Sequence, residues 1–201
     1  MRLVKKLLSR IYSIFRGAYE ESYVNALKTM CVISETTIIR PIAKIRNFSV
    51  SKEAIHLGQK TVLDGELLIF KHGGKIIIGD YCYIGEQSRI WSGELIQIGN
   101  NVLISHNVNI IDSTSHELES ESRALGYKYI IEKGHPEEKG SVKTAPIIIK
   151  DDVWINFNAT VLRGVTIGKG AIIAANAVIV NDVPDFAIMV GNPAKVVKYT
   201  V

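Results

Sequence analysis

Cysteine, long apolar runs and nucleophile motifs are scarce in this 201-residue chain, and each scarcity excludes a class of protein. The two cysteines, Cys31 and Cys82, form neither a CxxC pair nor a zinc-ligand spacing, so no metal is expected. A reducing, cytoplasmic setting is the expectation for so few thiols. No apolar run approaches the roughly 18 residues of a transmembrane helix. The chain has no GxSxG motif, which excludes the nucleophile elbow of a serine hydrolase.

Dense basic clusters are also missing. The net charge is only +4, and no run of five or more Lys and Arg residues occurs. A nucleic-acid binder would need a denser patch, so no nucleic acid is expected as a partner. An anionic small molecule fits this mild positive charge equally well.

A six-residue period runs through most of the chain instead. From Ile149 onward, every sixth residue is a bulky aliphatic, and the residue four places after it is a smaller apolar one. The aliphatic positions are Ile149, Ile155, Val161, Ile167, Ile173 and Ile179, and the smaller residues are Val153, Ala159, Val165, Ala171, Ala177 and Val183. The same spacing occurs upstream in three sets, namely Leu57, Leu63 and Ile69, then Ile78, Ile84 and Ile90, then Ile98, Ile104 and Ile110.

This period predicts an all-β fold with a parallel β-helix. A helix would repeat every 3.6 residues, whereas six is a multiple of the strand period of two. Each hexapeptide can therefore be a short strand followed by a turn, and three of them make one coil of 18 residues. Inward aliphatic rows of successive coils, about 4.8 Å apart, would then fill a narrow core.

Several of these hexapeptides resemble those of a known family. The segments at 78–83 (IGDYCY), 98–103 (IGNNVL) and 167–172 (IGKGAI) look like the hexapeptide-repeat acyltransferases. The stretch from Asp151 to Lys195 resembles the branch that O-acetylates galactosides, maltose and capsule sugars. The resemblance covers roughly residues 55–198. It implies left-handed winding, acetyl-CoA as co-substrate and a homotrimer with active sites between subunits.

Three parts of the chain are expected. Residues 1–54 contain an amphipathic helix, with Leu3, Leu7 and Ile11 on one face, and a β-rich lead-in. Residues 55–184 form the left-handed β-helix, broken by one long excursion loop at about 112–146, and residues 185–201 form a cap and a coenzyme-binding tail. For the basic N-terminal helix two interpretations stay open: packing on the β-helix or on a neighbouring subunit, and peripheral contact with the inner membrane face.

His116 is the expected catalytic base. It lies where the chain leaves the repeat, and the resemblance places the family's catalytic histidine at this point, although Glu117 stands where relatives have proline. An imidazole with a pKa near 6.5 is suited to remove a hydroxyl proton at neutral pH. Asp112 or Glu117 is expected to orient it, and the choice between them stays open. His106, Asp112 and Glu86 are predicted to bind substrate.

The coenzyme is expected on the last coils. Trp154 and Phe157 should face outward, because Val153 and Ile155 occupy the inward positions. By resemblance, this edge lines the pantetheine channel together with Ala175 and Val180. Lys195 and Lys198 match the basic pair that meets the coenzyme A phosphates. Cys82 falls at an inward position, so direct transfer is expected rather than a covalent intermediate.

These features predict an acetyl-CoA-dependent O-acetyltransferase that acts on a saccharide hydroxyl, in the biosynthesis of a surface polysaccharide. Acetylation of serine, an antibiotic or the amine of a nucleotide-linked sugar is the alternative. A γ-type carbonic anhydrase would need three shared zinc-binding histidines, which the spacing from His106 to His116 does not match. A non-catalytic β-helix scaffold is the last alternative.

Overall fold

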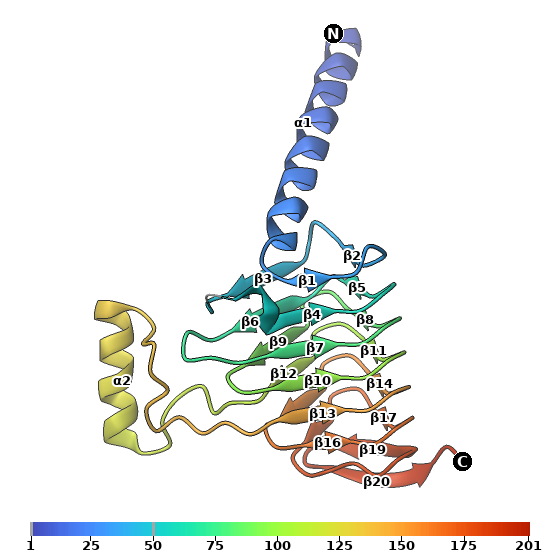
Figure 1. Cartoon of the computed structure of the whole chain (residues 1–201). Helices are drawn as coiled ribbons and strands as arrows, with labels where there is room; N and C mark the ends of the chain where they lie inside the picture. The colour runs from blue at the N-terminus through green and yellow to red at the C-terminus, as the bar shows by residue number, and fades with distance from the viewer. Residues whose placement is uncertain (1, 50) are drawn as a thin grey trace.

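The computed structural model describes residues 2–49 and 51–201, and it confirms the left-handed parallel β-helix with an N-terminal helix and one long excursion. The side chains of residues 2–4, 7, 9 and 11 are outside this description, so the predicted stripe positions Leu3, Leu7 and Ile11 lie outside the described residues. In Figure 1 the coils stack into a prism, with the helix α1 (Arg2–Lys28) at one end and the C-terminal strands at the other.

Three sheets form the flat sides of the prism, and each coil contributes one short strand to each side. Successive coils pair in parallel, and only β20 pairs antiparallel, with β19, among the described strands. The first sheet contains β1 (Val32–Ile33), β4 (Ile55–Leu57), β7 (Ile76–Ile78), β10 (Ile96–Ile98), β13 (Ile147–Ile149) and β16 (Thr166–Ile167). The second contains β2 (Ile38–Ile39), β5 (Val62–Leu63), β8 (Tyr83–Ile84), β11 (Leu103–Ile104), β14 (Trp154–Ile155), β17 (Ile172–Ile173), β19 (Ala187–Gly191) and β20 (Ala194–Tyr199). The third contains β3 (Lys44–Asn47), β6 (Glu66–Ile69), β9 (Arg89–Ser92), β12 (Asn109–Ile111), β15 (Thr160–Leu162) and β18 (Val178–Ile179).

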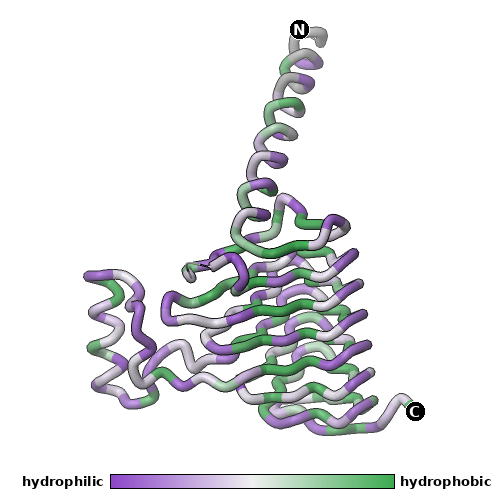
Figure 2. Tube along the Cα trace, viewed as in Figure 1, coloured by the Kyte–Doolittle hydropathy of each residue, from purple (hydrophilic) through white to green (hydrophobic). Residues whose placement is uncertain are grey.

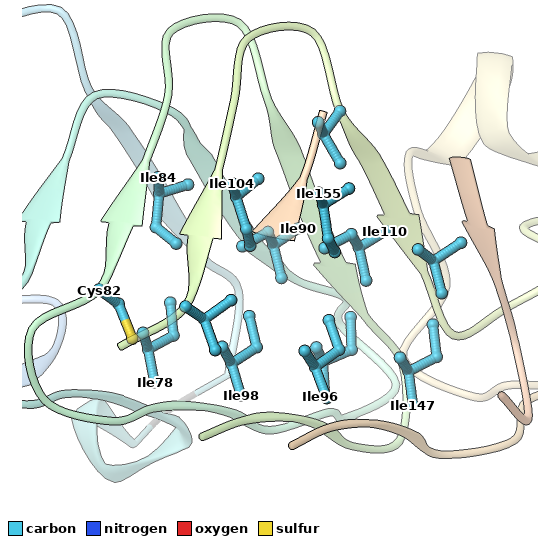
Figure 3. Close-up of a cluster of buried hydrophobic side chains, with 14 of the residues drawn as sticks. Ile78, Cys82, Ile84, Ile90, Ile96, Ile98, Ile104, Ile110, Ile147 and Ile155 are labelled. Carbon is cyan, nitrogen blue, oxygen red and sulfur yellow. The ribbon is translucent and has the colours of Figure 1, made fainter. Parts of the chain in front are cut away.

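The core is a single column of aliphatic side chains along the prism axis. Figure 3 shows isoleucines of successive coils pointing into one interior, with the sulfur of Cys82 among them. All six aliphatic positions predicted from Ile149 onward are at most 1% exposed. Figure 2 shows the corresponding alternation, with hydrophobic strands and hydrophilic corners. The hexapeptide period therefore predicts correctly which side chains point into the core.

Backbone conformation explains the residues at the corners. One residue in most corners has a positive φ, as at Asn101 (56°), Asn107 (58°), Asn158 (60°) and Asn176 (61°). Asparagine tolerates this left-handed region better than other residues with a β-carbon. Asparagine is therefore favoured at these corners, where the chain turns from one side of the prism to the next.

The β-helix begins earlier than the sequence predicted. Strands β1, β2 and β3 pair in parallel with β4, β5 and β6, so residues 32–47 form the first coil and not a separate lead-in. The six-residue spacing is present here too, at Ile33, Ile39 and Ile45. It was missed because this coil lies 24 residues before the next one, with a one-turn 3₁₀ helix (Lys52–Ala54) between them.

The excursion leaves the prism after β12 and returns at β13, and it contains the helix α2 (Ser120–Lys133). The sequence analysis expected a long loop here and no helix. Glu119 caps α2, because its carboxylate accepts hydrogen bonds from the amides of Glu121 (2.8 Å) and Ser122 (2.6 Å). These bonds lower the pKa of Glu119 to about 2. The ladder continues across the gap, since Ile110 pairs with Val161.

The period makes a direct prediction about stability, because adjacent residues of β13 differ in direction. Ile149 is 1% exposed and Ile148 is only partly buried on the outer face. Ile149→Ala should lower the free energy of unfolding by about 2–5 kcal/mol, since it leaves a cavity in the column. The matched variant Ile148→Ala should cost under about 1 kcal/mol in a chemical denaturation experiment. Equal losses would contradict the inward register.

Candidate active site

The chain leaves the prism at a corner that a buried carboxylate holds together. Asp112 is fully buried, and its oxygens accept hydrogen bonds from the Ser92 hydroxyl (2.7 Å) and the amides of Gly93 (2.7 Å) and Glu94 (3.0 Å). A buried carboxylate needs such donors to offset its lost hydration. The structure therefore replaces the substrate-binding role predicted for Asp112 with a structural one. Its carboxylate ties the start of the excursion to the preceding coil.

The two ends of the excursion are joined just beyond this corner. The Thr114 amide donates to the Lys143 carbonyl (2.9 Å), and the Ala145 amide donates to the Asp112 carbonyl (3.0 Å). Two further hydrogen bonds fold the segment back at His116: its amide donates to the Thr114 carbonyl (2.7 Å), and the Thr114 hydroxyl donates to the His116 carbonyl (2.8 Å). These hydrogen bonds close the base of the excursion, where its two ends meet. They also fix the backbone of His116 at that base.

His116 lines a cavity of about 790 Å³ between the excursion and the prism. Its ring is solvent-exposed, as a base that must reach an incoming substrate requires. The side of the prism contributes an aromatic wall of Phe70, His72 and Trp91, and α2 contributes Tyr129 and Ile130. Charged residues complete the lining, namely Lys71, Glu117, Lys133, Glu137, Glu138 and Lys139. Aromatic and apolar surfaces with a few polar groups are typical of small-molecule sites.

The aromatic wall contains unused hydrogen-bonding capacity. The His72 ring stacks on Phe70, with centroids 5.3 Å apart and planes 7° from parallel. Burial lowers the pKa of His72 below its ordinary value, and the nearby Lys139 lowers it further. Both effects favour the neutral form of the imidazole. Its Nδ1 and the Nε1 of Trp91 are buried and have no hydrogen-bond partner among the described residues. No local signal in the sequence marks either group, because only the coil register brings β6 and β9 beside the excursion.

Neither carboxylate expected to orient His116 does so through a hydrogen bond among the described residues. The Asp112 oxygens are occupied as described above. The Glu117 carboxylate faces α2 at Gly126, where an added β-carbon would lie 3.0 Å from its Oε2 atom. Gly126 therefore permits the close approach of α2 to the rim of the cavity.

Glu86 and His106 lie at a different corner, between the second and third sheets. Glu86 lines a smaller pocket of about 270 Å³ together with Asp64, Glu66 and Arg89. Asp64 is buried and accepts hydrogen bonds from Arg40 (2.9 Å) and from the Tyr83 hydroxyl (3.2 Å) through its Oδ2 atom. His106 packs edge-on against Tyr83, with ring centroids 6.4 Å apart. In one chain these predicted substrate residues and His116 therefore do not line the same cavity.

The residues predicted to bind the coenzyme gather on the last coils and the C-terminal strands. Trp154 and Phe157 are 41% and 52% exposed, as expected for outward positions. Phe157 lies one coil above Ala175, since the Asn176 amide donates to the Phe157 carbonyl (3.1 Å). Val180 follows β18 and is 40% exposed, and Lys195 and Lys198 are exposed on β20 beside β19. Phe157 and Ala175 thus share one corner, Val180 lies at the corner that follows the third sheet, and the two lysines lie at the C-terminal end.

The two cysteines are buried at 3% and 2% exposure, and neither lines the cavity. Burial raises the pKa of the Cys31 thiol to about 11 and also raises the pKa of Cys82. Little thiolate therefore exists at neutral pH, and a thiol is a poor nucleophile. Within the described residues, no group of three metal-ligating side chains comes together either.

Burial and raised pKa values predict inert thiols in the folded protein. Iodoacetamide at pH 7.5 should leave Cys31 and Cys82 unmodified in native protein and alkylate both after unfolding in guanidinium, as measured by intact mass. Because thiolate forms as pH approaches the raised pKa, native labelling should stay slow up to about pH 9. Rapid labelling of either residue in the native state would contradict the buried positions.

Comparisons with known proteins agree with this architecture. Residues 146–181 match the family model described as bacterial transferase hexapeptide (six repeats). A Saccharomyces cerevisiae protein named as an acetyltransferase, YJL218W, is 34% identical over 127 residues, which are 63% of this chain and 57% of that protein. A Staphylococcus aureus 2,3,4,5-tetrahydropyridine-2,6-dicarboxylate N-acetyltransferase is 56% identical over 54 residues, 27% of this chain and 23% of its own. This chain spans little more than half the length of such relatives, or less.

Solved structures show the same fold at low sequence identity. The polySia specific acetyltransferase NeuO aligns with a TM-score of 0.63 at 21% identity, over 85% of this chain and 66% of its own. The N-acyltransferase AntD from Bacillus cereus, in complex with dTDP and 3-hydroxybutyryl-CoA, aligns with a TM-score of 0.67 at 21% identity, over 87% and 86%. The hexapeptide-repeat resemblance and the β-helix fold inferred from it are therefore confirmed.

Proposed function

We propose that this chain is a hexapeptide-repeat transferase and that it transfers an acetyl group from acetyl-CoA to a hydroxyl group of a saccharide. The observation that carries the proposal is the position of His116 on the rim of a cavity of about 790 Å³ with an aromatic wall. A sugar offers apolar ring faces for such a wall and hydroxyl groups for the polar lining. Assembly of a surface polysaccharide is the setting that we propose for this reaction.

The reaction follows from the groups present. His116 would accept the proton of the acceptor hydroxyl as its oxygen attacks the thioester carbonyl. The carbon–sulfur bond breaks when the tetrahedral intermediate collapses, and the coenzyme leaves as a thiol after taking up a proton. In this direct transfer both substrates would be bound at the same time, and no residue of the protein would be acylated. The burial of both cysteines agrees with this mechanism. His72 would contribute its ring to the wall against which the acceptor lies.

A second chain is part of the proposal. On one chain His116 lies beside the excursion, whereas Phe157, Ala175 and Lys195 belong to the far corner and the C-terminal end. In a homotrimer, the far corner of a neighbouring subunit would bring the coenzyme to His116. The second sheet supports such packing, because its outward row is apolar: Ile38, Val62, Tyr83, Leu103, Trp154, Ile172 and Ile188 follow one another along the paired strands.

An amine acceptor is the second candidate. The N-acyltransferase AntD shares the fold and is solved with dTDP and an acyl-CoA. Glu86, Asp64 and Glu66 line a small pocket together with Lys44 and Arg89, and Glu66 Oε1 forms an ion pair with Arg46 (3.7 Å). Carboxylates such as that of Glu86 suit an ammonium group as well as a hydroxyl. Turnover of acetyl-CoA should be compared over matched sugars that carry either a hydroxyl or an amine.

His116→Ala should lower kcat for acetyl transfer by about 10² or more, because the attacking hydroxyl loses its base. Binding of coenzyme A, measured by calorimetry, should be unchanged. His56→Ala is the matched control, since His56 lies on the outer face of β4 and does not line the cavity. Full activity of the His116 variant with every acceptor that the wild type uses would overturn the site assignment.

Lys195→Ala should raise KM for acetyl-CoA roughly tenfold with kcat nearly unchanged, since it removes a ground-state contact with a phosphate. Lys128→Ala provides the control, because Lys128 is exposed on α2 and does not line the cavity. Steady-state kinetics with acetyl-CoA varied at saturating acceptor separates the two constants. An unchanged KM would remove Lys195 from the proposed coenzyme site.

A further inference from the structure

Most of α1 has no protein cover. Figure 1 shows the helix projecting beyond the first coil, away from the prism. Only its C-terminal part docks: Leu27 is buried, Val24 packs against the core, and the Tyr23 hydroxyl donates to the Ala43 carbonyl (2.9 Å). Further out, large apolar side chains are exposed to solvent, at 60% for Leu8, 67% for Tyr12, 63% for Ile14, 72% for Phe15 and 70% for Tyr19.

Four of these exposed residues form a stripe, and Ile14 lies on another side of the helix. At about 100° per residue, Leu8, Tyr12, Phe15 and Tyr19 fall within about 60° of one another on the helix surface. The stripe is continuous with the docked end, because the Tyr19 ring stacks on the Tyr23 ring at 6.5 Å. An amphipathic surface helix normally buries such a stripe against its own domain. Here the stripe continues past the end of the prism, so something outside this chain must cover it.

The charges of α1 indicate what that cover is. Residues 1–19 contain five Lys and Arg residues and no Asp or Glu. Among the described side chains, Lys6 and Arg10 lie opposite the stripe, and Lys5 and Arg16 flank it. The first acidic residue, Glu20, forms an ion pair with Arg16 (2.7 Å). A bundle of identical helices from several copies would bring together positive charges with few negative partners, which is unfavourable.

We propose that α1 docks the protein on an anionic lipid surface. The apolar stripe would enter the boundary between headgroups and acyl chains, with tyrosines at the interface and basic side chains at lipid phosphates. Among the residues that the structure describes, no helix is long and apolar enough to cross a membrane, so the helix would lie on the surface. This inference does not depend on the acyl transfer proposed above, since α1 contributes no residue to the cavity.

Co-sedimentation of the full chain with vesicles tests the proposal. The protein should bind vesicles that contain phosphatidylglycerol and not vesicles of phosphatidylcholine alone. Raising the salt from 0.1 M to 1 M should release it, because the screening length falls from about 10 Å to about 3 Å. Leu8→Ser with Phe15→Ser should lower the partition coefficient at least tenfold, roughly the loss of one or two buried apolar side chains.

A matched variant tests whether vesicle binding depends on the stripe of α1 or on exposed apolar side chains in general. Leu125→Ser with Ile131→Ser changes two residues of α2 that are each 67% exposed, and it should leave vesicle binding unchanged. Light scattering reports the oligomeric state of each variant. The proposal is overturned if the wild type does not bind anionic vesicles, or if both double variants bind them as strongly as the wild type does. Loss of oligomeric mass in the Leu8/Phe15 variant, without vesicle binding by the wild type, would assign the stripe to contacts between copies.

Discussion

Every other feature of this molecule depends on one constraint, the stacking of aliphatic side chains of successive coils inside a narrow prism. Each coil must place an aliphatic residue at every sixth position, because a polar residue there would lose hydration without gaining a partner. Parallel strands of two to four residues are too short to be stable alone, so each coil is held by the coils above and below it. The ladder of hydrogen bonds and the aliphatic column therefore form together.

This constraint applies to the inward residues and not to the residues at the corners of the coils. The candidate functional residues lie at corners, and these differ from one another. At one corner the chain departs for the excursion and returns without shifting the register, since Ile110 and Val161 still pair. The departure is held by the buried Asp112 carboxylate, which joins two coils by three hydrogen bonds. The Asp112 hydrogen bonds and the bonds that join the two ends of the excursion together fix His116 beside the aromatic wall of the prism.

The opposite corner and the C-terminal end have a different character. They combine exposed Phe157 and Trp154 with the free lysines of β20, which suits a long ligand with an apolar arm and phosphates. The His116 corner and this C-terminal end lie on different parts of the same prism. A reaction that uses residues from both would therefore need a second copy of the chain. The apolar outward row of the second sheet gives that copy a surface on which to pack. The N-terminal helix adds a surface of a third kind, apolar on one side and basic on the other.

The sequence by itself determined the core and the fold, because a hexapeptide period reports directly which side chains point inward. It marked Ile149 and its successors as inward residues, predicted a buried Cys82 and identified His116 at the point where the repeat stops. It did not determine the first coil, although Ile33, Ile39 and Ile45 carry the period, since a single set of three is weak evidence without its paired neighbours. Only the tertiary structure decided the roles of Asp112, His72 and Trp91. The donors to the Asp112 carboxylate lie about 20 residues earlier in the sequence, one coil along the axis, and a contact set by stacking register leaves no local pattern in the sequence.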